Sequence, residues 1–377
     1  MKKQILSKVF LAALVAFSMT ACDDDDDDDK LPAIEIADNT LDAIVTNYVD
    51  AVVLPTYKDL AEKNAALYDA VVKLKETPSD AAFETACDAW MNARQPWESS
   101  EAFLFGPVDE LGLDPNMDSW PLDQEAIEKI LSSGNFAELN WGEGDDSVAV
   151  EAAQSVRGFH TLEYLLFKDG KPRTTNDEDY KKSAESWGNY MLNVATLLKN
   201  DAQSLYDAWN KSYDNGDAYA TTFKSHNNST YSSAINCIEE IFDGCADIAS
   251  EVGTSKIKDP YDLYKSGKTE EGLYAVESWY SWHSRDDYSN NIRSIRNSYF
   301  GSLDGTIANN SLAKAVAEKD AEADKKLKDA ITAAIDAIQA IPQPFRSNIV
   351  CAESEAAMEA CNNLESVLNE LKGRIVR

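Results

Sequence analysis

His160 and Glu163 are the two residues whose types and spacing point most directly to chemistry. They lie in the segment Arg157–Phe167, which we expect to be part of a helix that begins near Ser147. A spacing of three residues places both side chains on one helix face, within reach of a shared ligand. Gly158 leaves space beside His160 where another helix or a ligand could approach. By itself, however, H-x-x-E is more often a hydrogen-bonded or exposed pair than a metal site.

Three carboxylates could add further metal ligands. Glu101 stands in an otherwise apolar run, where a buried carboxylate is costly unless something cationic pairs with it. It is therefore a candidate ligand, and the alternative is a salt bridge to Arg94 or Arg157. Asp118 and Asp123 fall in an irregular loop, where the alternative role is to cap the following helix.

The remaining candidates lie in the second half of the chain. One expected helical stripe of small or polar groups, bordered by aromatic rings, could line a cleft or form a solvated face; it consists of Glu277, Ser281, Ser284 and Tyr288. His226 lies in a polar loop, and we interpret it as incidental. His283 stands among tryptophan and tyrosine residues, and we expect it to be packed and satisfied instead of acting as a ligand.

The elements that must position these residues are predicted to be helices. Apolar residues recur at steps of three and four along most of the chain, and no segment shows the sustained alternation of strands. We predict a kink at Pro55. Roughly 340 residues of long helices exceed what one bundle core usually holds. The predicted fold is therefore all-α, with an N-terminal bundle (35–170) that carries the H-x-x-E helix, a C-terminal bundle (171–377), and a cleft between them.

The first residues are typical of an exported lipoprotein. Lys2 and Lys3 precede a short apolar run, and small residues then lead to Cys22. We interpret residues 1–21 as a signal peptide and residues 22–34 as a lipidated cysteine with an acidic tether. The apolar run is shorter than the ~20 residues of a membrane-spanning helix, so the lipid on Cys22 is the only predicted membrane attachment.

The charge of the chain restricts its partners. The formal net charge is −31, and it becomes −34 when residues 1–21, with their three lysines, are removed. Nucleic acid is therefore an improbable partner. An acidic surface raises the local concentration of cations, which suits metal capture but also plain solubility.

The cysteines suggest little chemistry. No C-x-x-C pair exists, which argues against structural zinc. Cys351 and Cys361 could form a disulfide in an oxidising compartment. Cys237 and Cys245 lie on one expected helix, about 12 Å apart along its axis, too far for a disulfide.

Four sequence blocks together resemble the imelysin family, also called insulin-cleaving membrane proteases. Gly158-Phe-His160-Thr-Leu-Glu163 is similar to the family's G-x-H-x-x-E signature. The other three blocks stand in the family's order over about residues 38–375: Glu101 to Pro107, Ser119 to Asp123, and Glu277-Ser278 through Ser281, Ser284, Asp287, Asn291 and Tyr299. The acidic run after Cys22 also resembles the signal that directs some lipoproteins to the outer face of the outer membrane.

The resemblance implies a fold, a location and a site. It implies two helical bundle-like domains with the signature helix facing a cleft, in iron-regulated lipoproteins on the cell surface or facing the periplasm. By that analogy His160 and Glu163 carry the site and Glu101 is the third ligand. Asp118 or Asp123, together with Ser281, lines it, and Arg157 is a further candidate for contact with the ligand.

Two functions remain open at this stage. One is capture of a metal ion, foremost iron, or of a small iron-containing ligand, for transfer to an uptake-system protein. One imidazole with several carboxylates suits iron, manganese or calcium better than a closed zinc site. The alternative is a zinc-dependent peptidase, for which a single histidine is thin ligation and no H-E-x-x-H helix exists. A third class, a purely structural surface protein, would be indicated by internal sequence repeats, and no such repeat is evident.

Overall fold

The structure, a computed structural model, describes residues 31–142 and 144–376. These residues are mostly helical, so the predicted all-α class is confirmed; the strands among them are the short antiparallel pair β1 (Phe167–Lys168) and β2 (Lys171–Pro172). None of the described helices combines the length and apolar character needed to cross a bilayer. The predicted signal peptide, Cys22 and most of the tether lie outside the described residues.

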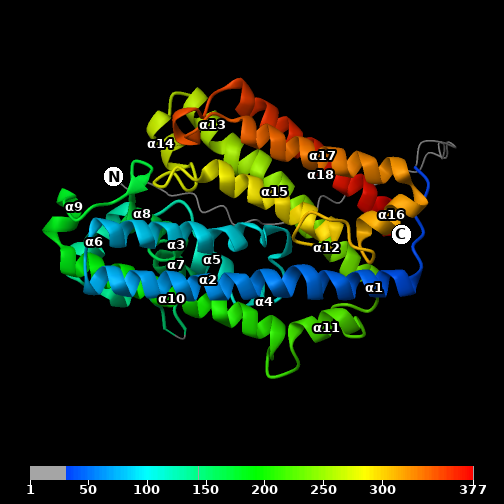
Figure 1. Ribbon diagram of the computed structural model, residues 1–377, viewed down its shortest axis with the longest axis horizontal. Coiled ribbons are helices and arrows are strands. Elements are labelled where there is room, and N and C mark those ends of the chain that lie inside the picture. The colour runs from blue at the N-terminus through cyan, green and yellow to red at the C-terminus, as the bar shows by residue number, and fades with distance from the viewer. Residues whose placement is uncertain (1–30, 143, 377) are drawn as a thin grey trace. The chain divides into compact units, whose positions relative to one another are not determined.

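The first group of helices is built around one long rod. Helix α1 (Asp38–Tyr48) continues through a π-helical segment (Val49–Val53) into α2 (Leu54–Glu76), and α2 packs against α3 (Asp80–Glu98) and α10 (Ala184–Asn210) (Figure 1). Pro55 lies in the first turn of α2. At the position of the predicted kink the chain forms a π-helical segment, and the helix then continues through Pro55, which has no N–H to donate.

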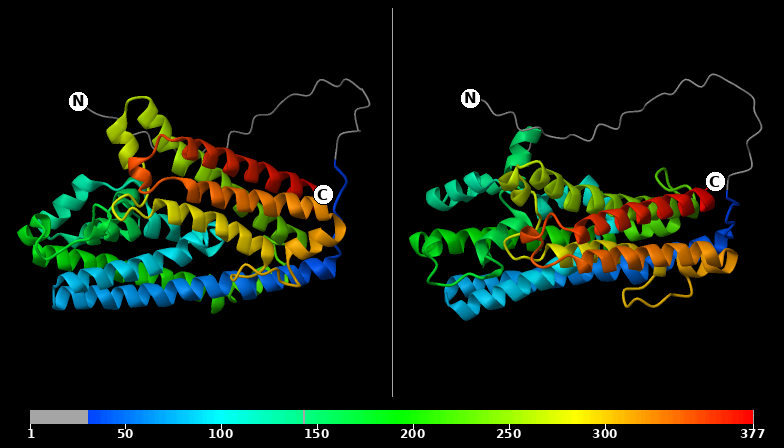
Figure 2. Two further views of the ribbon diagram at one scale, coloured as in Figure 1. Left: turned by 45° about the horizontal axis from the view of Figure 1, so that its top comes forward. Right: turned by 90° about the horizontal axis from the view of Figure 1, so that it is seen from above.

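The second group contains the helices that follow residue 233. Helix α18 packs against both α12 and α17, and α15 packs against α12, α17 and also α3, so α15 joins the two groups (Figures 1 and 2). The bounds are α12 (Ala234–Glu251), a π-helical segment (Val252–Ile257), α15 (Ser284–Phe300), α17 (Ala321–Ala340) and α18 (Ala352–Ile375).

Shorter helices connect and cover these long ones. They are the 3-10 turns Glu101–Phe103, Phe136–Leu139 and Phe345–Ser347, and α4 (Pro107–Glu110), α5 (Leu113–Asp118), α6 (Gln124–Ser133), α7 (Ser147–Gln154), α8 (Gly158–Leu166), α9 (Glu178–Lys182), α11 (Tyr219–Ser225), α13 (Lys258–Lys265), α14 (Thr269–Tyr274) and α16 (Leu312–Lys319).

Residues Ala33–Arg377 form one compact unit by their internal contacts. Helix α10 follows residue 170 in the sequence but makes its main helix contacts with α2 of the first group. The division into bundles at residue 170/171 remains a prediction.

The helix that carries His160 begins later than the sequence suggested. One helix from Ser147 was expected, whereas the chain forms α7 and then α8, with a break before Gly158. Gly158 has φ +87°, and a Cβ at this position would overlap the backbone carbonyl of Met117. Only glycine permits both this backbone conformation and such a close approach. The space beside His160 is therefore filled by the end of α5.

Helix α8 is held on two sides by buried aromatic side chains. The Trp90 indole of α3 donates to the Phe159 carbonyl at 2.9 Å. From α10, the Trp187 indole donates to the Leu165 carbonyl at 2.9 Å, and the Tyr190 hydroxyl donates to the Val156 carbonyl at 2.7 Å. Every residue of α8 except Tyr164 is buried, as expected for a helix that is apolar on nearly all sides.

The turn after α8 contacts a later loop. Asp169 and Gly170 form the two-residue connection between β1 and β2, both with positive φ. The Gly170 N–H donates to the Tyr280 carbonyl at 2.9 Å, and the ring of Trp282 lies where a Cβ on Gly170 would be. The turn thus ties the end of α8 to residues 280–282.

The proposed Cys351–Cys361 disulfide is absent. All five cysteines of the described residues are free thiols. Cys351 is the N-cap of α18, where its Sγ accepts from the Ser354 N–H, and Cys361 is buried further along the same helix. Ten residues of helix separate them by about 15 Å, so the prediction was wrong because both lie on one straight helix.

We expect Gly158→Ala to destabilise the protein by about 3 kcal/mol or more, because a methyl group there meets the Met117 carbonyl as well as unfavourable dihedral angles. Gly134→Ala is the control: Gly134 also has positive φ (+67°) but has no neighbour within 4 Å of a Cβ. The control should lose only about 1 kcal/mol. Urea unfolding would measure both, and equal losses would contradict the close approach of α5.

Candidate metal centre

Arg94, on α3, lies at the centre of a buried group of charged side chains. Its side chain has no exposed surface. Its Nη2 lies 2.5 Å from Glu98 Oε1 and 2.7 Å from Glu277 Oε1, and its Nε lies 3.4 Å from Asp287 Oδ2. Its Nη1 pairs with Asp118. One guanidinium thus faces four carboxylates, which leaves this group with excess negative charge.

His160 points its Nε2 atom into the same group. Nε2 lies 3.1 Å from Asp118 Oδ1 and 3.4 Å from Glu277 Oε1, and the ring lies edge-on to Trp120 with centroids 4.8 Å apart. Burial by itself lowers the pKa of His160. The charge and hydrogen bonds of the neighbouring carboxylates outweigh it, so the pKa is well above its ordinary value.

Glu163 holds the other side of the imidazole. Its Oε2 atom is 3.1 Å from His160 Nδ1, and its Oε1 atom accepts from the backbone N–H and the hydroxyl of Ser281, at 2.8 and 2.7 Å. His160 and Glu163 therefore do not turn toward one common point. Instead, Glu163 orients the ring so that Nε2 faces Asp118 and Glu277.

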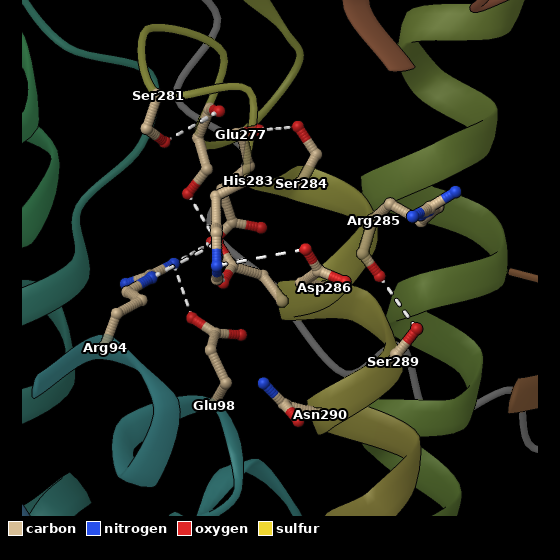
Figure 3. Close-up of polar contacts among 12 residues, drawn as sticks. Arg94, Glu98, Glu277, Ser281, His283, Ser284, Arg285, Asp286, Ser289 and Asn290 are labelled. Carbon is tan, nitrogen blue, oxygen red and sulfur yellow. Dashed lines mark hydrogen bonds and ion pairs between the residues drawn. The ribbon is translucent and has the colours of Figure 1, made fainter. Parts of the chain in front are cut away.

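Residues 275–283 form an irregular loop before α15, which begins at Ser284. The expected helical stripe from Glu277 to Tyr288 was therefore wrong over its first part. Ser278 and Trp282 have φ of 51° and 64°, conformations that interrupt a helix and that L-residues rarely adopt. This loop places Glu277 against Arg94 (Figure 3). The Ser281 hydroxyl of the same loop donates to Glu163.

Asp287 anchors this loop from α15. Its Oδ2 atom accepts from the Ser278 hydroxyl at 2.5 Å, and its Oδ1 atom is 2.7 Å from His283 Nδ1. His283 is thus packed and paired, as predicted. Burial by itself lowers the pKa of His283, but the charge of Asp287 outweighs it and raises the pKa to about 9.

A cavity of about 330 Å³ lies next to this group. Residues from both halves of the chain line it. The only cationic side chain of the lining is Lys256, whereas the acidic ones are Glu101, Asp114, Asp118, Glu251, Asp259 and Glu277. Burial raises the pKa of Asp114 to about 7. The cavity wall therefore carries more acidic than basic groups.

Glu101 is the carboxylate without a partner. Its exposed fraction is 8%, and within the described residues it makes no hydrogen bond and no ion pair, so the expected alternative of a salt bridge to Arg94 or Arg157 is not formed. Burial raises the pKa of Glu101 well above its usual range. A buried acid of this kind is costly to the fold unless a cation joins it.

Two groups of donor atoms are close enough to hold a metal ion. Asp118, His160 and Glu277 form one group, and Glu98, Glu101 and Asp118 form the other; the ligand atoms within each group lie within 4.8 Å of one another. Asp118 belongs to both groups, which therefore adjoin. Together they offer one imidazole nitrogen and several carboxylate oxygens.

Comparison with known proteins identifies the family. A sequence model of the imelysin family matches residues 53–371. The chain belongs to the imelysin family. The predicted resemblance is thereby confirmed.

Relatives agree over most of the chain. A solved structure described as an iron-regulated protein A precursor from Parabacteroides distasonis is 38% identical, with a TM-score of 0.85, and covers 92% of this chain and 98% of its own. An imelysin peptidase from Bacteroides ovatus is 60% identical, but the match covers 52% of this chain and 56% of the other, with a TM-score of 0.52. Iron-regulated protein A from Synechococcus elongatus is 28% identical over 323 residues, 84% of this chain and 82% of its own.

The structure brings together most of the residues selected from the imelysin-like sequence blocks. His160, Glu163 and Ser281 form one hydrogen-bonded chain, and Asp118 and Glu101 lie on the side that faces the cavity.

Two further candidates lie elsewhere. Asp123 is the N-cap of α6, where it accepts from the Ala126 N–H at 3.0 Å. Arg157 pairs with Asp201 and lies over the ring of Trp141. His226, interpreted as incidental, ends α11 and lies 3.1 Å from Asp42.

Other residues of the centre were not found from the sequence. Glu98 and Lys256 were not singled out, and Arg94 was considered only as a partner for Glu101. The signal for Arg94 and Glu98 was present: they are four residues apart on one helix, and Trp90 and Trp97 lie on the same face as Arg94. Lys256 carries no comparable signal, because it follows α12 in an ordinary polar stretch.

We expect His283 to titrate near pH 9 in the metal-free protein, against an ordinary value of 6.5. Because the folded pKa is raised, this ion pair stabilises the fold fully below about pH 6.5 and loses its contribution as pH rises through about 9. NMR titration of the imidazole and urea unfolding across this range would measure it. His283→Gln should remove this part of the pH dependence, and a histidine titrating near 6.5 would contradict the pairing with Asp287.

Proposed function

We propose that this imelysin-family protein captures a metal cation, foremost iron, at the adjoining donor groups of Asp118, His160 and Glu277 and of Glu98, Glu101 and Asp118. The observation that carries the proposal is the Glu101 carboxylate: it is nine-tenths buried, it has no partner within the described residues, and it borders the cavity. A cation arriving there would bind this carboxylate directly, whereas Lys256, the cation of the cavity wall, makes no ion pair with it.

The chemistry of the donors supports iron over zinc. Carboxylate oxygens with one imidazole suit iron, manganese or calcium. Each donor group of the described residues holds at most one histidine. Two relatives carry the name iron-regulated protein A, which agrees with this choice. The 330 Å³ cavity has room for an ion with several waters, at about 30 Å³ for each water.

The surrounding groups would prepare these ligands. The bond from Glu163 to His160 Nδ1 leaves Nε2 to face the donor group, an arrangement common around metal-bound histidines. Arg94 pairs with Glu98, Asp118 and Glu277 and does not line the cavity; its Nη2 also lies 3.3 Å from His160 Nε2. We infer that the cation enters through the cavity and binds oxygens that Arg94 keeps in place.

The peptidase alternative gains less support. A zinc peptidase needs an open metal position and a separate general base that can reach the attacking water. The Glu163 carboxylate is bonded to His160 and to two donors of Ser281, so it orients the imidazole ring and is not placed to act as a general base. Capture for uptake therefore accounts for more of the observed contacts than hydrolysis does.

Glu101→Gln tests the proposal through two opposite effects. It should stabilise the metal-free protein by about 1 kcal/mol at neutral pH, because glutamine has no carboxyl group whose ionisation is opposed by burial. It should also weaken Fe²⁺ binding by at least about tenfold, because it removes an anionic ligand. Urea unfolding and anaerobic calorimetry would measure these changes.

His160→Ala should likewise lose metal, measured by elemental analysis of the purified protein, whereas His226→Ala is the matched control and should bind normally. A wild-type protein that carries no metal and shows no Fe²⁺ affinity would refute the proposed function.

We further propose that the chain is attached to the outer membrane through lipid on Cys22 and passes its metal to an uptake-system protein. The apolar run, the small residues before Cys22 and the acidic residues after it support this attachment. Cys22→Ser should abolish incorporation of labelled palmitate and release the protein from the membrane fraction. Unchanged lipid labelling would contradict the assignment.

A further inference from the structure

Lys256 is the single cationic side chain in the cavity wall, and it faces the donors proposed above. Its Nζ lies 3.0 Å from Glu277 Oε2 and 3.6 Å from Glu251 Oε1. The other oxygen of Glu277, Oε1, belongs to the donor group around His160 and pairs with Arg94. Glu277 therefore pairs with two cations, with Arg94 through Oε1 and with Lys256 through Oε2.

The two cations are held very differently. Arg94 has no exposed side-chain surface, pairs with four carboxylates and lies over the Phe159 ring. Lys256 is 10% exposed, borders the cavity, and makes its hydrogen bond to one carboxylate. An ammonium on a flexible stem exchanges partners more readily than a guanidinium held at several points. A cation entering the cavity would therefore displace Lys256 and leave Arg94 in place.

The structure also provides a destination for the displaced ammonium. Glu251 and Asp259 line the same cavity, and the side chain of Glu251 is 51% exposed. The Lys256 backbone is fixed, because its carbonyl accepts from the Tyr288 hydroxyl at 3.2 Å. Only the side chain needs to turn, from Glu277 toward Glu251.

We propose that Lys256 is a tethered cation that occupies the cavity side of the centre until a metal ion replaces it. The proposal rests on the metal-capture function proposed above and adds an exchange: Glu277 Oε2 releases the ammonium and becomes available to the ion. The net change of charge in the cavity is then smaller than for simple addition of an ion, because the ammonium moves outward. Competition from the ammonium lowers the affinity for the ion, which suits a protein that transfers its ion to a partner.

Calorimetry with Mn²⁺, a redox-stable probe, gives the first test. Lys256→Met should bind Mn²⁺ at least about tenfold more tightly than wild type, because no tethered charge competes. Lys258→Met is the matched control: Lys258 is exposed and pairs with Asp262, so its loss should change the affinity by less than about twofold.

Lysine acetylation gives the second test and separates exchange from simple charge removal. The full-length wild-type protein is treated with a water-soluble acetylating reagent with and without Mn²⁺, and Lys256 is quantified by mass spectrometry. Mn²⁺ should raise the acetylation rate of Lys256 several-fold and leave that of Lys258 unchanged.

The outcomes separate the two proposals. If wild type binds Mn²⁺ but Lys256→Met gains no affinity, or if Mn²⁺ protects Lys256 from acetylation, the exchange is refuted and metal capture stands. If neither binds Mn²⁺ or Fe²⁺, both proposals fail.

Discussion

The buried guanidinium of Arg94 is the interaction on which the arrangement of the centre depends. Its four carboxylate partners come from distant parts of the sequence: Glu98 from α3, Asp118 from the end of α5, Glu277 from the loop before α15, and Asp287 from α15. Burying these acids without a cation would cost several kcal/mol each. Arg94 therefore determines that the two groups of helices meet where they do.

The same arrangement explains why the centre has a structural side and a binding side. On the structural side, Asp287 is satisfied by Ser278, His283 and Arg94. On the cavity side, Glu101 has no partner among the described residues. A fold that needed only stability would pair or replace this acid, so its retention is a cost that ligand binding can offset.

Features of the structure that depend on residues close together in the sequence were predicted, whereas features that depend on distant segments were not. The all-α class and the placement of His160 and Glu163 on one helix face depend on neighbours three or four residues away, and the structure agrees with both. The two side chains, however, bond to each other instead of facing one common point. The break before Gly158 and the irregular backbone at Trp282 were missed, because both are imposed by distant segments. Asp118 and Asp123 illustrate the limit. They lie five residues apart in one stretch, yet one joins the centre and the other caps α6, a difference set by where α5 ends.

The connection between β1 and β2 has a consequence for how the sequence can vary. Its glycine lies against the Trp282 ring and bonds to Tyr280, so the turn forms part of the support for the loop that carries Glu277 and Ser281. Lengthening this turn by one residue would shift that loop. By contrast, Gly134, at the end of α6, has open space around it. Family members should therefore keep a constant length in the turn between β1 and β2 and tolerate insertions after α6, at Gly134.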